Sequence, residues 1–108
     1  DYLLMLNLDA AEFAQKITQP SVVLLDVRTP AEFNEGHIPN AVNIDVLADY
    51  FTADIETLDK SKAYAIYCRS GKRSLDAAYV MGEVGFDKTF NLTGGIIEWV
   101  EAGKQTVS

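Results

Sequence analysis

The stretch "AYAIYCRSGKRS", residues 63–74, indicates the fold because it passes from a strand through a loop into a helix. Its first five residues form an apolar run, which is typical of a strand buried on both faces. A helix is expected to begin at Arg73 or Ser74, and Cys68 opens the loop between the two elements. Ligands of parallel α/β sheets bind at the carboxyl ends of strands, close to helix N-termini. Cys68 is therefore predicted to occupy a functional position.

The rest of the chain continues this alternation of strands and helices. Apolar runs predict further strands at 21–27, 41–44 and 89–92, with a weak edge strand around 3–6. Capping signals predict helices that begin near Asp9, which has Glu12 three residues on, and at Thr29, where Pro30 and Glu32 follow. Further helices are expected within 46–58 and over 95–102, and the helix after Cys68 should bury Leu75, Ala78, Tyr79 and Gly82.

This order of elements predicts an α/β fold of three layers. A central, mainly parallel, five-stranded sheet is expected to carry helices on both faces, because strands that alternate with helices pair in parallel. The chain has 108 residues, of which 48% are hydrophobic and 23% charged, so residues 1–108 are expected to form a single domain.

The charge balance argues against two classes of partner. A net charge of −7 is unfavourable for binding nucleic acid or an anionic membrane surface. No apolar stretch approaches the roughly 20 residues that cross a bilayer. A monomer is the default expectation for the oligomeric state.

Cysteine and histidine usage limits the chemistry further. The chain has one cysteine and one histidine, so an internal disulfide is excluded and no metal or cofactor site is expected. A single free cysteine fits a cytoplasmic location. The chain starts at Asp1 rather than methionine, which points to a processed or truncated N-terminus and leaves a periplasmic origin open.

The loop after Cys68 is predicted to bind an anion. Three of the chain's nine cationic residues, Arg69, Lys72 and Arg73, lie within six positions of an otherwise acidic protein. Gly71 permits the tight turn, and the backbone N–H groups of the loop and of the helix start should point inward. These groups would lower the pKa of Cys68 and make it a nucleophile. The alternatives are an inert, buried cysteine and a solvated patch of cations.

Three blocks of sequence resemble the rhodanese family of sulfurtransferases. Beside the cysteine loop, "LLDVRTPAEFNEGHIPNAVNI" (24–44) is similar to the amino-terminal signature of the family, and "FNLTGGIIEWVEAG" (90–103) to its carboxyl-terminal signature. The blocks cover most of the chain in the family's order. One departure is Asn40, which stands where the family has glycine; asparagine tolerates the left-handed backbone region better than other residues.

The resemblance implies a two-step reaction. Cys68 would attack thiosulfate or a related small anionic sulfur donor, release sulfite and become a persulfide. A thiol or cyanide would then accept the sulfur, and the physiological acceptor could be a thioredoxin-like or sulfur-relay protein. The expected substrate-binding residues are Arg69, Ser70, Gly71, Lys72 and Arg73, with Ser74, Asp26 and Arg28 in support.

Other signature residues are expected to be structural. Asp26 and Arg28 should form a buried ion pair more readily than they reach the loop, and Glu32 is interpreted as a capping residue. His37 should be a turn residue and Trp99 a core residue. Gly94 and Gly95 should let the last helix approach the cysteine loop closely.

Two rival functions come from other classes. One is a phosphatase or an arsenate reductase: enzymes of this kind place five residues between cysteine and arginine, whereas four separate Cys68 from Arg73, so negligible phosphatase activity is expected. A non-catalytic binding module of this family would usually lack the cysteine that this chain retains.

Overall fold

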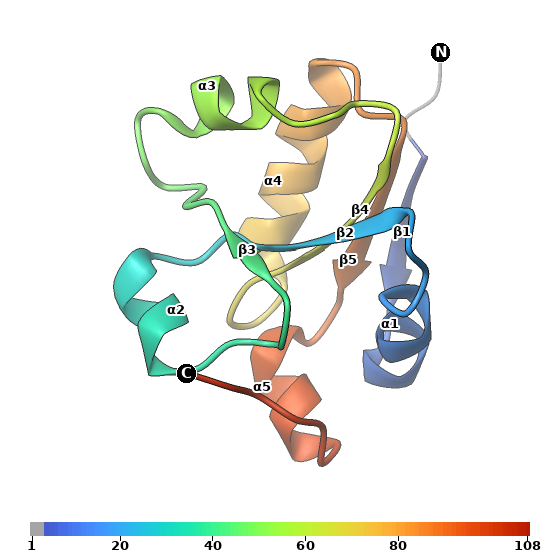
Figure 1. Cartoon of the computed structure of the whole chain (residues 1–108), viewed down its shortest axis with the longest axis vertical. Coiled ribbons are helices and arrows are strands. Elements are labelled where there is room, and N and C mark those ends of the chain that lie inside the picture. Colours follow the sequence, from blue (N-terminus) through green and yellow to red (C-terminus); the bar gives the residue numbers. More distant parts are fainter. Residues whose placement is uncertain (1–3) are drawn as a thin grey trace.

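The computed structural model describes residues 4–108 and consists of one sheet covered by helices (Figure 1). The strands are β1 (Leu4–Leu8), β2 (Val22–Asp26), β3 (Val42–Asn43), β4 (Ala63–Tyr67) and β5 (Lys88–Leu92). The helices are α1 (Ala10–Lys16), α2 (Pro30–Glu35), α3 (Phe51–Glu56), α4 (Lys72–Glu83) and α5 (Gly95–Glu101). The expected edge strand is confirmed from Leu4 onward; residue 3 lies outside the described part.

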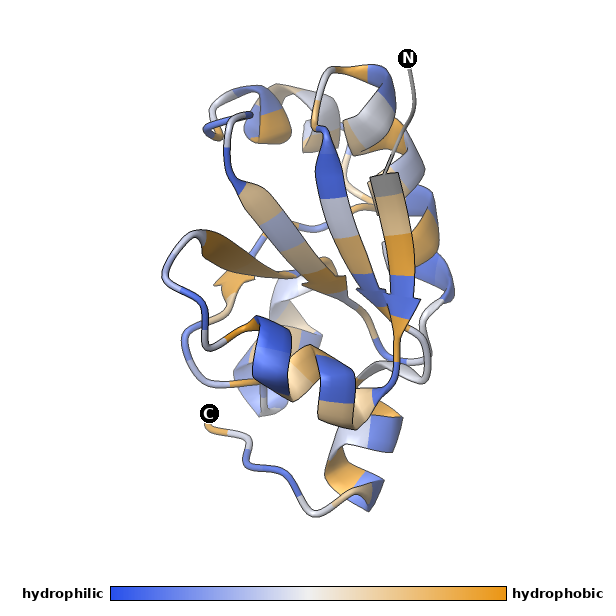
Figure 2. Cartoon of the chain, turned by 90° about the vertical axis from the view of Figure 1, so that its right-hand side faces the viewer, coloured by the Kyte–Doolittle hydropathy of each residue, from blue (hydrophilic) through white to orange (hydrophobic). Residues whose placement is uncertain are grey.

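All strand pairings in this sheet are parallel. The strand order is β1-β5-β4-β2-β3, so β4 is central, with β2 and β5 as its neighbours. Figure 2 shows the arrowheads of the strands gathered at one end of the sheet. Cys68 follows β4 at this end, and the predicted α/β fold is confirmed.

Helices bury both faces of the sheet, as expected for strands that read as continuous apolar runs. One core lies between the sheet and helices α3 and α4, where Phe51, Ile55 and Met81 pack on Leu25 and Ile66. The other core lies on the opposite face.

In the second core, Phe13 of α1 and Trp99 of α5 pack with Leu24, Tyr67 and Leu92. The ring of Phe13 meets those of Tyr67 and Trp99 edge to face. The prediction that Trp99 is a core residue is confirmed, since its side chain is buried and its indole N–H donates to the carbonyl of Gln105 at 2.8 Å.

The predicted helix starts are confirmed by their hydrogen bonds. Asp9 with Glu12, and Thr29 with Glu32, both form capping boxes, and Pro30 occupies the first turn of α2. Each box satisfies two backbone N–H groups that would otherwise lack partners. Asn40 adopts a φ of 73°, so asparagine does take the left-handed conformation at the position where the family has glycine.

The prediction for α4 was wrong in two details. The helix begins at Lys72 rather than at Arg73 or Ser74, with Gly71 as its N-cap. Its buried residues are Ser74, Ala77, Ala78 and Met81, whereas Tyr79 is 54% exposed. The apolar residues alone misplaced the buried face because a serine and two alanines occupy it, where α4 packs closely against the sheet and the cysteine loop.

The C-terminal segment turns back toward α2. Val107 and His37 form an antiparallel bridge, with backbone hydrogen bonds of 2.7 and 2.8 Å, and Figure 1 shows this segment running from α5 to the end of α2. The prediction that His37 is a turn residue is confirmed: its Nδ1 lies 2.9 Å from the carbonyl of Phe33, and the two rings stack.

No helix in the described part of the chain combines the length and the apolar character needed to cross a bilayer.

Candidate active site

The loop between β4 and α4 folds around the sulfur of Cys68. The backbone N–H of Gly71 donates to Sγ at 3.0 Å, and the hydroxyl of Ser74 lies 3.4 Å from the same atom. Gly71 has a φ of 101°, a left-handed value that favours glycine. A Cβ at this position would also collide with the carbonyl of Thr93, so glycine is required here on two grounds.

The environment of Cys68 favours its ionised form. Burial raises the pKa of the thiol, but hydrogen bonds from the Ser74 hydroxyl and from the N–H groups of Ser74, Gly71 and Ser70 outweigh burial and lower it. Hydrogen bonds to a charged group stabilise that group, and the start of α4 adds the positive end of its dipole. The predicted direction of the shift is confirmed, and its main causes are neutral donors rather than the nearby cations.

Cys68 is nearly inaccessible, with only 1% of its surface exposed. It borders the apolar core of the α4 face, as an inert cysteine would. An inert cysteine, however, would not have backbone amides and a hydroxyl directed at its sulfur. Arg69 and Ser70, which directly follow Cys68, are exposed, so the loop that surrounds the sulfur faces solvent on its outer side.

The start of α5 is hydrogen-bonded to the backbone of the cysteine loop. The N–H groups of Ile96 and Ile97 donate to the carbonyls of Cys68 and Arg69, at 2.9 and 3.2 Å. Gly95 has a φ of 62°, and a Cβ there would collide with the carbonyl of Arg69. The predicted close approach of the last helix to the cysteine loop is therefore confirmed at Gly95.

The three cations of the loop differ in their surroundings. Arg73 forms a bidentate ion pair with Glu32 of α2, at 2.9 and 3.0 Å. Among the described residues, Arg69 and Lys72 have no ion-pair partner, and both are exposed. Much of the charge of Arg73 is thus neutralised within the protein.

The sequence interpretation of Glu32 was incomplete. Its carboxylate caps α2 and also pairs with Arg73, which lowers the pKa of Glu32 to about 2, mainly through the Arg73 hydrogen bonds. Forty-one positions separate these two residues, and no local pattern marks such a contact. The pair ties α2 to the first turn of α4.

The ion pair between Glu32 and Arg73 is expected to stabilise the fold in a way that depends on pH. Because the folded pKa of Glu32 lies below its ordinary value of 4.5, its contribution is complete above about pH 4.5 and disappears as the pH falls through about 2. Glu32→Gln should therefore be less stable than wild type at neutral pH, and the two should converge in acid. Urea unfolding between pH 2 and 7 measures this difference, with Glu35→Gln, on the same helix, as the control. A difference that stays constant over the whole range contradicts the assignment.

Asp26 and Arg28 form a buried ion pair at the end of β2. Both Asp26 oxygens accept from the guanidinium, at 2.6 to 3.0 Å, and Arg28 also donates to the carbonyl of Gly36. The structural role predicted for this pair is confirmed. Burial lowers the pKa of Arg28, but the hydrogen bond and charge of Asp26 outweigh it and raise the pKa.

Tyr67 and Asn43 complete this cluster. The Tyr67 hydroxyl accepts from the N–H of Ile38, and burial followed by the charge of Asp26 raises the pKa of Tyr67. The amide of Asn43 donates to the carbonyls of Asp26 and Arg28. Together these contacts fix the segment that follows β2, next to the cysteine loop.

Sequence reasoning missed Asn91, a buried amide of β5. Its Nδ2 donates to the carbonyl of Gly71 at 3.3 Å and its Oδ1 contacts the Ser74 hydroxyl, so it holds both sides of the cysteine loop. An asparagine inside a segment predicted to be a buried strand, "TFNL", was the available signal.

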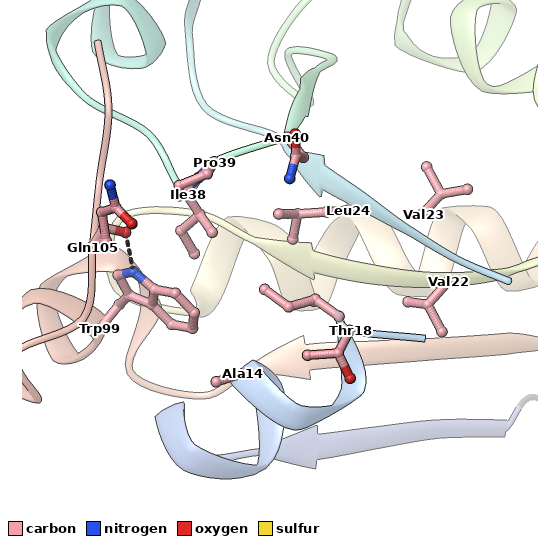
Figure 3. A pocket seen from close by; sticks show the side chains of 11 residues that line it. Ala14, Thr18, Val22, Val23, Leu24, Ile38, Pro39, Asn40, Trp99 and Gln105 are labelled. Atoms are coloured by element: carbon pink, nitrogen blue, oxygen red, sulfur yellow. Dashed lines mark hydrogen bonds between the residues drawn. The ribbon is translucent and has the colours of Figure 1, made fainter. Parts of the chain in front are cut away.

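Two surface hollows lie near the sheet, and only one of them adjoins the cysteine loop. One, of about 490 Å3, adjoins the loop and is lined by Arg28, Arg69 and residues of α2 and α5. The other, of about 570 Å3, lies on the α1 side of the sheet between Thr18, Ile38 and Trp99 and contains no residue of the loop (Figure 3). The larger hollow is therefore remote from the cysteine chemistry.

The match to a family model decides the classification. The model of the rhodanese-like domain matches residues 9–102. The chain belongs to the rhodanese-like domain family. The cysteine loop, β4, the amino-terminal signature and all but the last residue of the carboxyl-terminal signature lie inside the matched range.

Two proteins of similar length resemble most of the chain. A sulfurtransferase of Allochromatium vinosum is 33% identical over 103 residues, which cover 94% of each protein. The crystal structure of a rhodanese-related protein from Thermoplasma volcanium has a TM-score of 0.82 at 30% identity and covers 94% of this chain and 97% of that one.

Two further relatives carry more specific names. The thiosulfate:glutathione sulfurtransferase of Saccharomyces cerevisiae is 35% identical, over 78% of this chain and 68% of that protein. The tRNA uridine(34) hydroxylase of Erwinia tasmaniensis is 31% identical over 91% of this chain, which corresponds to only 29% of that longer protein. A segment similar to this chain therefore also occurs within a longer protein.

Proposed function

We propose that this chain is a sulfurtransferase that carries a sulfane sulfur on Cys68 as a persulfide. The observation that carries the proposal is the sulfur of a lone cysteine at the carboxyl end of the central strand, hydrogen-bonded by the Gly71 N–H and next to the Ser74 hydroxyl. The sulfurtransferase names of several relatives support the same function.

In the first step, the Cys68 thiolate attacks the outer sulfur of thiosulfate. A bond forms between Sγ and that sulfur, the sulfur–sulfur bond of thiosulfate breaks, and sulfite leaves with the electron pair. The persulfide keeps one negative charge, and the N–H groups of Ser70, Gly71 and Ser74 are the donors best placed to stabilise it.

In the second step, an acceptor removes the outer sulfur and restores the thiolate. Cyanide becomes thiocyanate, and a thiolate acceptor becomes a persulfide. No net oxidation or reduction is needed, so the cycle uses no cofactor. Two half-reactions that share a covalent intermediate predict ping-pong kinetics.

The donor is proposed to be thiosulfate because of the charge of the loop. Arg69 and Lys72 are exposed at the loop surface and can attract a small dianion. Arg73, by contrast, pairs with Glu32. Its predicted role in donor binding therefore requires that its guanidinium interact with Glu32 and with the donor at the same time. The same pairing leaves less positive charge for a phosphate, which agrees with negligible phosphatase activity.

Intact-protein mass spectrometry tests this function. After incubation with thiosulfate, the protein should gain the mass of one sulfur atom, and added cyanide should remove that sulfur as thiocyanate. Loading from glutathione persulfide but not from thiosulfate would keep sulfur transfer and reject the donor. No added sulfur from either donor would contradict the proposal.

A further inference from the structure

A chain of side-chain hydrogen bonds runs from the buried Cys68 through Ser74 and Asn91 to Asn7 of β1. The Ser74 hydroxyl lies 3.4 Å from Sγ of Cys68 and 2.5 Å from Oδ1 of Asn91. The other end of the Asn91 amide donates to Oδ1 of Asn7 at 3.0 Å and to the carbonyl of Gly71. Ser74 and Asn91 are 0% and 2% exposed, so solvent does not compete for the contact between them, whereas Asn7 at the other end of the chain of contacts is exposed.

The hydroxyl of Ser74 has two acceptors but only one proton. When Cys68 is a thiol, every group is satisfied: the S–H donates to Oγ of Ser74, and the hydroxyl donates to Asn91. When Cys68 loses its proton to solvent or base, the sulfur can only accept hydrogen bonds. Sγ of Cys68 and Oδ1 of Asn91 then compete for the single proton of the Ser74 hydroxyl. The Asn91 amide cannot turn to offer its nitrogen without giving up Asn7 and Gly71.

We propose that Asn91 is a positioning residue that competes with the Cys68 sulfur for the Ser74 hydroxyl and so opposes ionisation of the thiol. The backbone N–H groups of the loop favour the thiolate, and Asn91 limits the additional help that Ser74 gives. This proposal rests on the proposed function, because the thiolate matters as the nucleophile. Asn91 touches neither donor nor acceptor and acts only through Ser74.

The charged groups near the sulfur lie away from Asn91. Arg69 and Lys72 belong to the loop and the start of α4, and Arg73 interacts with the charge of Cys68 while paired with Glu32 of α2. Asp45, after β3, also lies near Arg73. The side of the sulfur that faces β5 and β1 contains the neutral amides Asn91 and Asn7. An uncharged substitution of Asn91 therefore changes hydrogen bonding without changing charge.

The experiment titrates Cys68 by its thiolate absorbance at 240 nm. The chain has one cysteine, and subtracting the spectrum of the corresponding Cys68→Ser protein removes the tyrosine signal. Asn91→Leu should raise the thiolate-to-thiol ratio roughly two- to tenfold at a fixed pH, which corresponds to one net hydrogen bond. Ser74→Ala should lower that ratio.

The double variant Asn91→Leu with Ser74→Ala tests whether Asn91 acts on the sulfur through Ser74. If Asn91 acts through Ser74, Asn91→Leu should have no effect on the ratio in the Ser74→Ala background. Thr89→Val is the matched control, since Thr89 is buried on the same face of β5 and has no contact with Sγ. Asn91→Ala replaces Asn91→Leu if thermal unfolding shows that the leucine variant does not fold, and the same increase is expected.

Two results would overturn the proposal. One is an unchanged ratio in both folded Asn91 variants, and the other is an equal increase with and without Ser74, which would assign the effect to the Gly71 carbonyl. The titration uses no sulfur donor. A protein that shows the Asn91 effect but takes up no sulfur would therefore contradict the sulfurtransferase function alone.

Discussion

A Cys68→Ser variant is expected to lose sulfur transfer to the detection limit of the assay and to keep its fold. Serine can still accept the Gly71 N–H, so the loop keeps this contact, which measures 3.0 Å to the cysteine sulfur. Its hydroxyl, however, does not ionise near neutral pH and cannot carry a second sulfur atom. The thiosulfate–cyanide assay measures activity, and circular dichroism with thermal unfolding measures the fold.

The matched control for this variant is Thr89→Val, a buried substitution on β5 with no contact to the loop. It should transfer sulfur at the wild-type rate. Residual turnover in Cys68→Ser that exceeds the uncatalysed rate would show that another group carries the sulfur. Loss of the folded state in this variant would instead show that the thiol is needed for packing, as in an inert core cysteine.

The largest effect on stability is expected from Asp26→Ala. This change leaves the Arg28 guanidinium buried with no carboxylate partner, while its contact to the Gly36 carbonyl remains. Removing one partner of a buried ion pair typically lowers the free energy of unfolding by about 3–5 kcal/mol. Urea unfolding at neutral pH measures the change.

The exposed pair between Lys60 and Glu56 provides the control. Glu56→Ala removes a pair of similar length, 2.8 Å, that lies in solvent, and should change the free energy of unfolding by less than about 1 kcal/mol. If Asp26→Ala is too unstable to purify, Asp26→Ala with Arg28→Met removes both charges and should restore a folded protein. Equal effects of Asp26→Ala and Glu56→Ala would contradict the assignment.

Local sequence features predicted most elements because the interactions that form them are local. The capping boxes at Asp9 and Thr29 span three residues each, and β4 was predicted with its observed bounds. The buried face of α4 was harder to predict. Hydropathy only weakly distinguishes the alanines and the serine on that face from surface residues.

The candidate site was predicted in part for the same reason. Cys68, Gly71 and Ser74 lie within seven positions, so the strand, loop and helix bring the sulfur, the amide and the hydroxyl together without help from distant segments. The pairing of Arg73 with Glu32 and the contact of Ser74 with Asn91 join segments 41 and 17 positions apart. Neither contact could be found without the packing of α2 and β5 beside α4.

The sequence by itself determined the alternation of strands and helices, the family and the place of the lone cysteine at the end of a strand. These follow from short-range patterns of hydropathy, capping and turn residues. Only the tertiary structure decided which distant groups act on the cysteine loop: Asn91, which shares the Ser74 hydroxyl with the sulfur, and Glu32, which pairs with Arg73. Packing makes these choices because hydrogen bonds and ion pairs depend on ångström-scale distances between segments that the chain order leaves unspecified.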